Sequence, residues 1–365
     1  MKLTLNDFDY YLPPERIAKY PAEPRDSSRL LVVDRTTGEI KDDYFYNLGV
    51  YLNPGDVIVR NNTKVIPARI VGKKDTGGKL ELLLVKKISH TATVETWECL
   101  SKPGLKVGQK GIFSDVLQAT CTGICEDAYT RTVEFNMAGP EFIAELTRIG
   151  ITPLPPYIAE AHTDENVFRE QYQTIYAKFD GSAAAPTAGL HFTKKLDENL
   201  KKHGIHIVEV TLHVGLGTFL PVKTENITEH HMHSEWFELP AETAAAVQKA
   251  KDNGNRVIAV GTTSNRVLES CSSLNSEGEF TITPQIADTD IYIYPPYKFV
   301  CVDTLITNFH LPKSTLLMLV SAFVSQPNSD ELFTKFCESL IGRAYTYAIK
   351  NEYRFYSFGD GMIIL

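Results

Sequence analysis

NRVIAVGTTSNRVLESCSSL, residues 255–274, is the stretch of sequence that decides the fold. Its first part, NRVIAVG, is a short apolar run rich in β-branched residues, and it predicts a buried strand. From Thr262 onward the spacing changes to that of a helix, so a strand leads directly into a helix. The same alternation continues on both sides from about Tyr172, and it indicates an α/β domain.

The neighbouring segments extend this alternation of strands and helices. We expect helices in KKLDENLKKHG (194–204), PAETAAAVQKAKDNG (240–254) and PKSTLLMLVSAFV (312–324). The first two end at a glycine, the residue that most readily closes a helix. We expect strands in IHIVEVTLHVG (205–215), TDIYIYPPY (289–297) and VDTLITNF (302–309).

A different pattern occupies the chain from about Asp56 to Asn136. Short β-rich runs such as DVIVRNN, KLELLLVKKI and RTVEFN are separated by turn residues, which predicts a compact barrel or sandwich. A helix in PEFIAELTRIG (140–150) follows. Because LLVVD near the N-terminus also reads as sheet, we expect a main α/β domain with a mixed β-sheet, formed by residues 1–58 and 150–365. An inserted all-β, barrel-like domain would occupy residues 59–149.

Composition is ordinary for a globular chain, with 365 residues, 43% hydrophobic and 22% charged. The first residues contain no apolar signal region, and no apolar run is long enough to span a membrane. We therefore expect a cytoplasmic protein, not bound to a membrane, and a monomer. The cysteines are scattered without metal or disulfide spacing and predict reduced thiols: Cys99, Cys121, Cys125, Cys271, Cys301 and Cys337.

Positive charge is concentrated in one segment, although the net charge of the chain is −8. Residues 56–87 contain eight basic and three acidic side chains. A local basic face on an acidic protein can bind phosphates and still discourage indiscriminate binding of polyanions. The same pattern also fits a solvated strand surface, and both interpretations remain open.

Three histidines lie in unusually apolar surroundings. His191 lies in AAPTAGLHFT, His213 in VTLHVGLGTF and His310 in ITNFHLPKST. Apolar flanks predict burial, and the small polar neighbours leave room for a ligand. Imidazole is the side chain most readily used as an acid or base near neutral pH, so one shared polar pocket is the functional interpretation. Three separately hydrogen-bonded core histidines are the alternative.

Two further segments place polar side chains where a predicted strand meets a predicted helix. In α/β domains such turns bind ligands, because the helix N-terminus offers free N–H groups. GLG in residues 215–217 does not complete a dinucleotide fingerprint, and no P-loop, GxSxG or zinc deaminase motif is found in the sequence. The candidate side chains are Thr262, Thr263, Asn265 and Arg266 in one segment, and Asn308, His310 and Lys313 in the other.

The string TEHHMHSEWFE (228–238) allows a metal hypothesis. His231 and His233 would point to the same side of a strand and could chelate. No HExxH or CxxC accompanies them, so an imidazole–carboxylate pair of His233 with Glu235 is an alternative use of that face. A metal-dependent hydrolase and a non-catalytic RNA-binding protein both remain open at this point.

Several strings together resemble the S-adenosylmethionine:tRNA ribosyltransferase-isomerase family of queuosine biosynthesis. They run in order from near the N-terminus to the last residues, which makes the resemblance far more specific than any short motif. The matching strings include YPAEPRDSSRLLVVDR (20–35), NNTKVIPAR (61–69), AAPTAGLHFT (184–193), TLHVGLGTFLPV (211–222), AVGTTSNRVLES (259–270), TNFHLPKSTLLMLVSAF (307–323) and YRFYSFGDGMIIL (353–365).

The resemblance implies a specific reaction. Members of this family join the ribosyl part of S-adenosylmethionine to 7-aminomethyl-7-deazaguanine at the wobble position of tRNA. Epoxyqueuosine remains on the tRNA, and adenine and methionine leave. The resemblance further implies that S-adenosylmethionine is a consumed substrate, that no metal or other cofactor takes part, and that a β-barrel domain is inserted in a mixed α/β domain.

On this basis the candidate residues receive roles. The acid, base and anchoring set is His191, His213 and His310, with His233 and Glu235 as a supporting pair. The donor-binding set is Thr262, Thr263, Asn265, Arg266, Asn308 and Lys313. The first four would hold the ribose or the methionine carboxylate of the donor, with Arg266 as the natural carboxylate partner. Phe192, Phe219 or Phe309 would face the sulfonium. The tRNA-binding set is Arg60, Lys64, Arg69, Tyr353, Arg354 and Tyr356.

Overall fold

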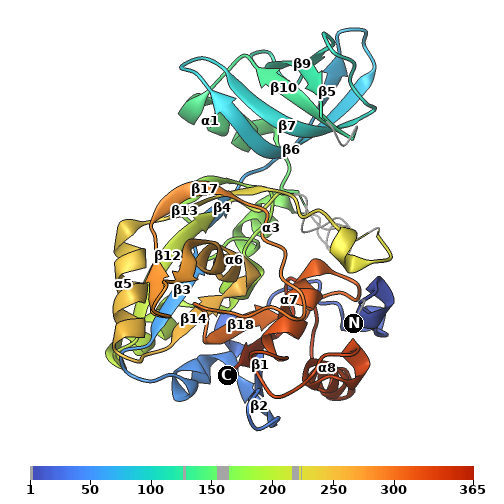
Figure 1. The fold of residues 1–365 in the computed structure, drawn as a ribbon. Helices are drawn as coiled ribbons and strands as arrows, with labels where there is room; N and C mark the ends of the chain where they lie inside the picture. The colour runs from blue at the N-terminus through green and yellow to red at the C-terminus, as the bar shows by residue number, and fades with distance from the viewer. Residues whose placement is uncertain (1–2, 126–128, 154–163, 216–221, 223) are drawn as a thin grey trace.

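The computed structural model describes residues 3–125, 129–153, 164–215, 222 and 224–365. Two bodies are visible in Figure 1, a large α/β body and a smaller barrel above it, joined near β4 and β6. The expected fold class, a mixed α/β domain with an inserted barrel, is therefore what the described chain forms.

The larger body is built on a nine-stranded mixed sheet. Its strand order is β17-β13-β12-β3-β14-β18-β19-β1-β2. The four strands β12, β3, β14 and β18 run parallel, whereas both edges of the sheet contain antiparallel pairs. The bounds are β1 (Arg29–Val33), β2 (Ile40–Tyr44), β3 (Val57–Asn61), β12 (His206–Leu212), β13 (Glu235–Leu239), β14 (Val257–Val260), β17 (Gln285–Thr289), β18 (Thr304–Asn308) and β19 (Gly361–Ile364).

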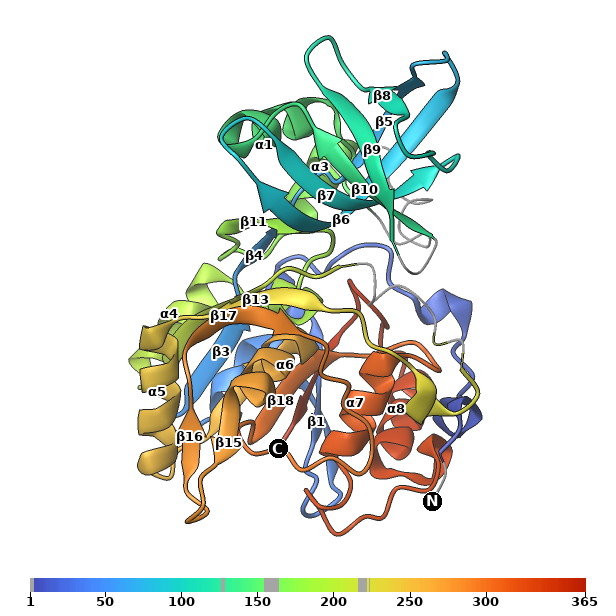
Figure 2. The ribbon, with the colours of Figure 1, turned by 45° about the horizontal axis from the view of Figure 1, so that its top comes forward.

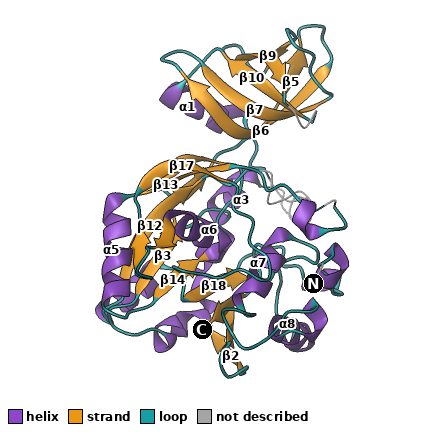
Figure 3. Cartoon of the chain, viewed as in Figure 1, coloured by secondary structure: helices purple, strands orange, loops and turns teal. Residues whose placement is uncertain are grey.

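Both faces of this sheet are covered, as Figure 3 shows. In β14, Val257 and Ala259 belong to one hydrophobic core, and Ile258 and Val260 belong to the core on the other face. This explains why the strand reads as a continuous apolar run, because alternate side chains point to opposite faces and both are buried. The result is a sheet with helical layers on its two sides.

The helices divide between the two faces. Residues of α5 (Ala241–Asp252), α6 (Gly261–Cys271), α7 (Thr315–Phe323) and α8 (Leu340–Lys350) belong to the first core. Residues of α4 (Lys194–Lys202), η4 (Phe45–Tyr51) and η5 (Thr187–His191) belong to the second. The remaining elements are α3 (Glu165–Gln171), β4 (Thr63–Val65), β11 (Phe179–Ser182), β15 (Ser272–Leu274), β16 (Phe280–Ile282), η1 (Leu5–Phe8), η2 (Pro14–Arg16), η3 (Arg25–Ser27), η7 (Ile227–Glu229) and η8 (Phe336–Glu338).

The smaller body is a closed antiparallel barrel with its own core. Its strand order is β10-β7-β6-β5-β8-β9, and closure leaves no open sheet edge. Trp97, Phe135 and Phe142 pack inside it, the last from α1 (Gly139–Ile149). The strand bounds are β5 (Arg69–Lys74), β6 (Lys79–His90), β7 (Glu95–Lys102), β8 (Lys110–Ile112), β9 (Gln118–Ile124) and β10 (Thr130–Phe135).

The segment that leads into the barrel differs from the sequence interpretation. DVIVRNN was grouped with the all-β unit, but β3 lies in the centre of the main sheet, between β12 and β14. Its register pairs Val57 with both His206 and Val257, partners far along the chain. A local reading of β propensity cannot detect such pairing. The domain boundary predicted after residue 58 thus falls inside β3, and the barrel strands begin at Arg69.

A second difference concerns TDIYIYPPY. The strand there is β17, which ends at Thr289, so the tyrosine-rich part is not in a strand. The carbonyls of Thr289 and Ile291 instead accept hydrogen bonds from the guanidinium of Arg266, at 3.2 and 3.3 Å. A side chain therefore satisfies backbone groups that a strand neighbour would otherwise pair.

The central strand supplies a test of the layered core. Ile258 is fully buried and Ile286, on β17, is 65% exposed. We expect Ile258→Ala to lower the free energy of unfolding by about 2–5 kcal/mol, because it leaves a cavity in the core. Ile286→Ala, the matched control, should change it by less than about 0.5 kcal/mol. Urea unfolding measures both, and equal losses would contradict the layered arrangement.

Candidate active site

A large cavity of about 790 Å³ lies where the barrel meets the α/β body. Its barrel side includes Lys86, Lys87 and Tyr129, and its other side includes His213 and residues 229–236. Figure 2 shows β6 and β7 facing β13 and β11 across the region where the two bodies meet. A space of this size can take a nucleoside, and it is lined by residues of both bodies.

His213 is held firmly in the wall of this cavity. It follows β12 directly; its Nδ1 lies 2.8 Å from Thr63 Oγ1, and its ring stacks on Trp236 at 5.0 Å. Burial lowers the pKa of His213 to about 4, so the imidazole is neutral near pH 7. Gly181 is needed beside it, since a Cβ there would lie 2.7 Å from Nε2. The ring is thus fixed in one orientation, facing the cavity.

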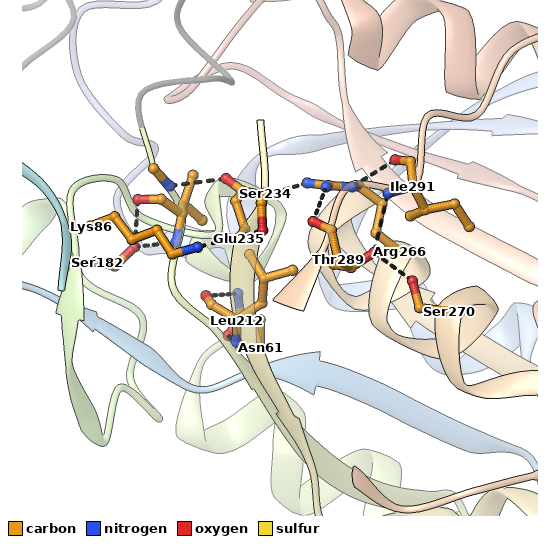
Figure 4. Close-up of polar contacts among 12 residues, drawn as sticks. Asn61, Lys86, Ser182, Leu212, Ser234, Glu235, Arg266, Ser270, Thr289 and Ile291 are labelled. Carbon is orange, nitrogen blue, oxygen red and sulfur yellow. Dashed lines mark hydrogen bonds and ion pairs between the residues drawn. The ribbon is translucent and has the colours of Figure 1, made fainter. Parts of the chain in front are cut away.

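Glu235, which also lines this cavity, forms a buried ion pair with Arg266, as Figure 4 shows. Their side chains are 2% and 4% exposed, respectively. The other oxygen of Glu235 accepts the N–H of Gly215 at 2.9 Å, and Arg266 also donates to the carbonyls of Thr289 and Ile291. The pair therefore ties α6, β13, the end of β17 and the residues after β12 together.

This arrangement corrects two predictions. Glu235 was expected to orient His233, but its two oxygens are engaged by Arg266 and by Gly215, while His233 is exposed at the cavity. Arg266 was expected to hold a carboxylate of the donor, but it is already paired with Glu235 and with two carbonyls. Residues 31 positions apart make this pair, so strand periodicity could not reveal it.

A second, smaller cavity of about 70 Å³ lies at the carboxyl ends of the parallel strands β14 and β18. It gathers many of the residues expected to bind the donor, on two segments separated by more than forty positions. Predicted residues that line it are Thr262, Thr263, Asn308, Phe309 and His310, and Tyr356, which was expected to bind tRNA, lines it too. The strand-to-helix turn and the end of β18 meet there because the two strands are neighbours in the sheet.

His310 and His191 are both buried near this second cavity. Nε2 of His310 lies 3.2 Å from Thr307 Oγ1, and its Nδ1 has no partner among the described residues. His191 does not line the cavity, and its two nitrogens contact Ser28 Oγ at 2.8 Å and Asn308 Nδ2 at 3.2 Å. Burial lowers the pKa of His310 to about 3 and that of His191 to about 4.

The three histidines therefore do not line one pocket. His213 lines the interdomain cavity, His310 lines the small cavity, and His191 lies behind Asn308. The two cavities are nevertheless neighbours, because Val214 lines the small one and its sequence neighbours His213 and Gly215 line the large one. The segment 213–215 runs between them.

Other predicted donor residues lie apart from both cavities. Asn265 is fully buried on α6 without lining either one, and both polar atoms of its amide lack a partner in the described chain. Phe192 packs edge-on against Phe45 inside the core and lines neither cavity. Lys313 pairs with Asp9 at 2.9 Å. Phe219 lies outside the described residues.

The expected RNA-binding residues separate into two groups. Arg60 is buried in β3 and paired with Asp197 at 2.7 Å, and Tyr353 is fully buried. Neither can meet RNA in this arrangement, which corrects their assignment. Lys64, Arg69 and Arg354 remain partly exposed, and each also pairs with a carboxylate: Asp180, Glu81 and Asp360, respectively.

The sequence interpretation did not single out several residues of the large cavity. Lys86 reaches from β6 to Asp288 at 3.0 Å and to Ser234 at 3.4 Å, and so bridges the two bodies. Trp236 stacks on the His213 ring, and Lys87 and Tyr129 line the cavity on its barrel side. Lys86 and Lys87 were within the basic segment, so charge clustering was the signal that could have found them.

The histidine-rich stretch provides no metal-ligand set in the described chain. Among residues with a described position, no three or more His, Cys, Asp or Glu side chains lie together in a way that could hold a metal ion. His230, His231 and His233 line the interdomain cavity instead.

Comparison with known proteins gives a family match over nearly the whole chain. A family model described as a queuosine biosynthesis protein matches residues 5–364. The chain is 50% identical over 366 residues to the S-adenosylmethionine:tRNA ribosyltransferase-isomerase of Carboxydothermus hydrogenoformans, and all of both chains are covered. It is 46% identical over 365 residues to the protein of that name from Thermotoga maritima, again over the full length of both.

A solved structure agrees with the fold. The crystal structure of S-adenosylmethionine tRNA ribosyltransferase from Thermotoga maritima superposes with a TM-score of 0.52 at 36% sequence identity. The alignment covers 98% of this chain and 100% of that one. The predicted fold class is confirmed by this match together with the sheet and barrel described above.

The buried ion pair leads to a stability prediction. Arg266→Met should lower the free energy of unfolding by about 3–5 kcal/mol, because Glu235 is left buried without a counter-charge. The double variant Arg266→Met/Glu235→Gln should regain part of that loss, since the glutamine is neutral and still accepts from Gly215. Lys41→Met, which breaks the exposed pair with Glu39, is the control and should cost under about 1 kcal/mol. Chemical unfolding measures these free energies. An equal loss in Arg266→Met and in Lys41→Met would contradict the stabilising role of the buried pair.

The buried histidines lead to a pH prediction. The pKa of His191 is lowered to about 4, against about 6.5 in an unfolded chain, so acid favours the unfolded state. The stability that neutral His191 contributes is complete above pH 6.5 and is lost as the pH falls towards 4, by about 3 kcal/mol. His191→Gln should therefore flatten the fall in unfolding free energy between pH 6.5 and 4. His203→Gln, an exposed control, should keep the wild-type slope.

Proposed function

This chain belongs to the queuosine biosynthesis protein family of S-adenosylmethionine:tRNA ribosyltransferase-isomerases, and on that premise we propose the reaction that it catalyses. The ribosyl part of S-adenosylmethionine is transferred to 7-aminomethyl-7-deazaguanine at the tRNA wobble position and isomerised. Epoxyqueuosine-tRNA, adenine and methionine are the products. The observation that carries this proposal is the match to relatives from end to end, at 46–50% identity.

The cavity between the barrel and the α/β body is the proposed place of reaction. A wobble base must leave the anticodon stack to react, and a cavity of about 790 Å³ can receive it. Exposed Lys87 and half-buried Lys86 stand on its barrel side, where the phosphates of an anticodon loop would find positive charge. Lys64 and Arg69, which lie on strands leading to and into the barrel, add two basic side chains that would exchange Asp180 and Glu81 for phosphates.

The chemistry requires proton transfers at three points. A base removes a proton beside the sulfonium, an acid assists the departure of adenine, and a base frees the attacking amine. His213 is the proposed acid–base residue at the interdomain cavity, because its ring is neutral, fixed by Thr63 and Trp236, and faces the open space. His191 and His310 have anchoring roles in this proposal, since both are buried on the side of the small cavity.

S-adenosylmethionine is a consumed substrate in this proposal, and no metal or other cofactor is assigned. A cytoplasmic location and a monomeric state are proposed with it, in keeping with a tRNA substrate. No helix in the described part of the chain is long and apolar enough to cross a membrane.

The reaction is tested by mixing the protein with S-adenosylmethionine and tRNA that carries 7-aminomethyl-7-deazaguanine. Mass spectrometry should show adenine and methionine released in equal amounts, with a matching gain of mass on the tRNA. A tRNA that carries unmodified guanine at the wobble position is the control. Lack of any release with the modified tRNA would rule the proposal out.

The role of His213 has its own test. His213→Phe keeps a ring to stack on Trp236 but removes the nitrogens, so turnover should fall by about 10²- to 10⁴-fold. Binding of the donor, measured by calorimetry, should change little. His206→Gln, an exposed substitution on β12, the strand that precedes His213, should leave turnover unchanged. Unaltered turnover in His213→Phe would exclude an acid–base role.

A further inference from the structure

The small cavity at the ends of β14 and β18 has the features of an anion site. The N-terminus of α6, an eleven-residue helix, opens onto it through Gly261, Thr262 and Thr263, and no side chain caps that end. The N–H groups of a first helical turn have no partner inside the helix, and the helix dipole gives them a partial positive charge. An oxyanion would be stabilised there.

Two buried side chains supply independent support. Thr263 and His310 are 8% and 5% exposed, both line the cavity, and Thr263 Oγ1 and His310 Nδ1 have no hydrogen-bond partner in the described chain. A buried polar atom without a partner is costly, by about 1–3 kcal/mol. A ligand that accepts hydrogen bonds from both atoms would remove this cost.

One of the two neutral tautomers of His310 makes its free nitrogen a donor. Its Nε2 lies 3.2 Å from Thr307 Oγ1, and when that hydroxyl donates to Nε2 the ring proton is on Nδ1. His310 then carries an N–H, as Thr263 carries an O–H, that has no partner in the described chain, and both side chains line the cavity. With the backbone N–H groups of the first turn of α6, these two side chains form a set of hydrogen-bond donors.

The charge of the cavity lining favours a carboxylate over a phosphate. The cavity has a volume of about 70 Å³, and none of the described residues that line it is Lys, Arg, Asp or Glu. A doubly charged phosphate buried without a full counter-charge is costly, whereas a single negative charge can be balanced by helix N–H groups and two neutral donors. A phosphate of the tRNA backbone also bears a bulky chain on both sides.

We propose that this cavity binds the α-carboxylate of S-adenosylmethionine, through the first turn of α6, Thr263 Oγ1 and His310 Nδ1. The assignment rests on the proposed function for the identity of the donor. In this assignment the cavity takes the place of Arg266 as the partner of the donor's carboxylate, because Arg266 is paired with Glu235. Val214 lines this cavity and His213 lines the next one, so a carboxylate held here lies beside the chain neighbour of the proposed acid–base residue.

The test compares two ligands on matched variants. Calorimetry measures the binding of S-adenosylmethionine and of decarboxylated S-adenosylmethionine, which lacks only the carboxylate. Thr263→Val keeps the shape of the side chain and removes the hydroxyl, so it should lower the affinity for S-adenosylmethionine by about 10- to 100-fold. The affinity for the decarboxylated analogue should not change.

Two further variants are the controls. Thr263→Ser restores a hydroxyl and should recover the affinity, which separates a lost hydrogen bond from a damaged fold. Ser264→Ala removes a buried hydroxyl of the same helical turn that does not line the cavity, and should leave both affinities unchanged.

The outcomes distinguish the two proposals. If Thr263→Val weakens the binding of both ligands equally, and the wild-type enzyme releases adenine, the carboxylate site is overturned and the proposed reaction stands. A wild-type protein that neither binds S-adenosylmethionine nor releases adenine with the modified tRNA would overturn both.

Discussion

The buried ion pair of Glu235 and Arg266 is the constraint on which the arrangement of the site depends. One carboxylate oxygen faces the guanidinium and the other holds the N–H of Gly215, so the segment after β12 cannot move independently of α6. That segment is the wall between the two cavities. A charge pair removed from water is stable only when its remaining hydrogen bonds are also satisfied, and here the carbonyls of Thr289 and Ile291 complete the set.

The division into two cavities separates two chemical tasks. The small cavity lies at the ends of parallel strands, where helix N–H groups are fixed by the sheet and suit a ligand that must be held in place. The large cavity is shared by two bodies with separate cores, and Lys86 crosses between them through Asp288 and Ser234. A macromolecule that binds there can contact both bodies at once. This suits the tRNA, which must enter and leave in each turnover.

The parts of the structure that depend on local sequence could be predicted. The turn from β14 into α6, the burial of His191 and His310, and the barrel strands all follow from periodicity and turn residues within short windows. What failed depends on partners distant in the chain. Arg60 was assigned to RNA because nothing nearby reveals Asp197, and Tyr353 is covered by core residues that no spacing identifies. Pair formation between distant residues is decided by tertiary packing, so single-residue patterns cannot assign it.

The place of β19 in the sheet has a consequence for the order of synthesis. Residues 361–364 fill the position between β18 and β1, pairing antiparallel with the first and parallel with the second. Until residues 361–364 have been made, β1 and β2 have no strand that joins them to the rest of the sheet, although they are made more than three hundred residues earlier. The barrel needs only residues up to about 149 and can close during translation. A chain made only as far as β18 can therefore have a closed barrel on a sheet that still lacks β19, the strand that pairs with β18 beside the small cavity.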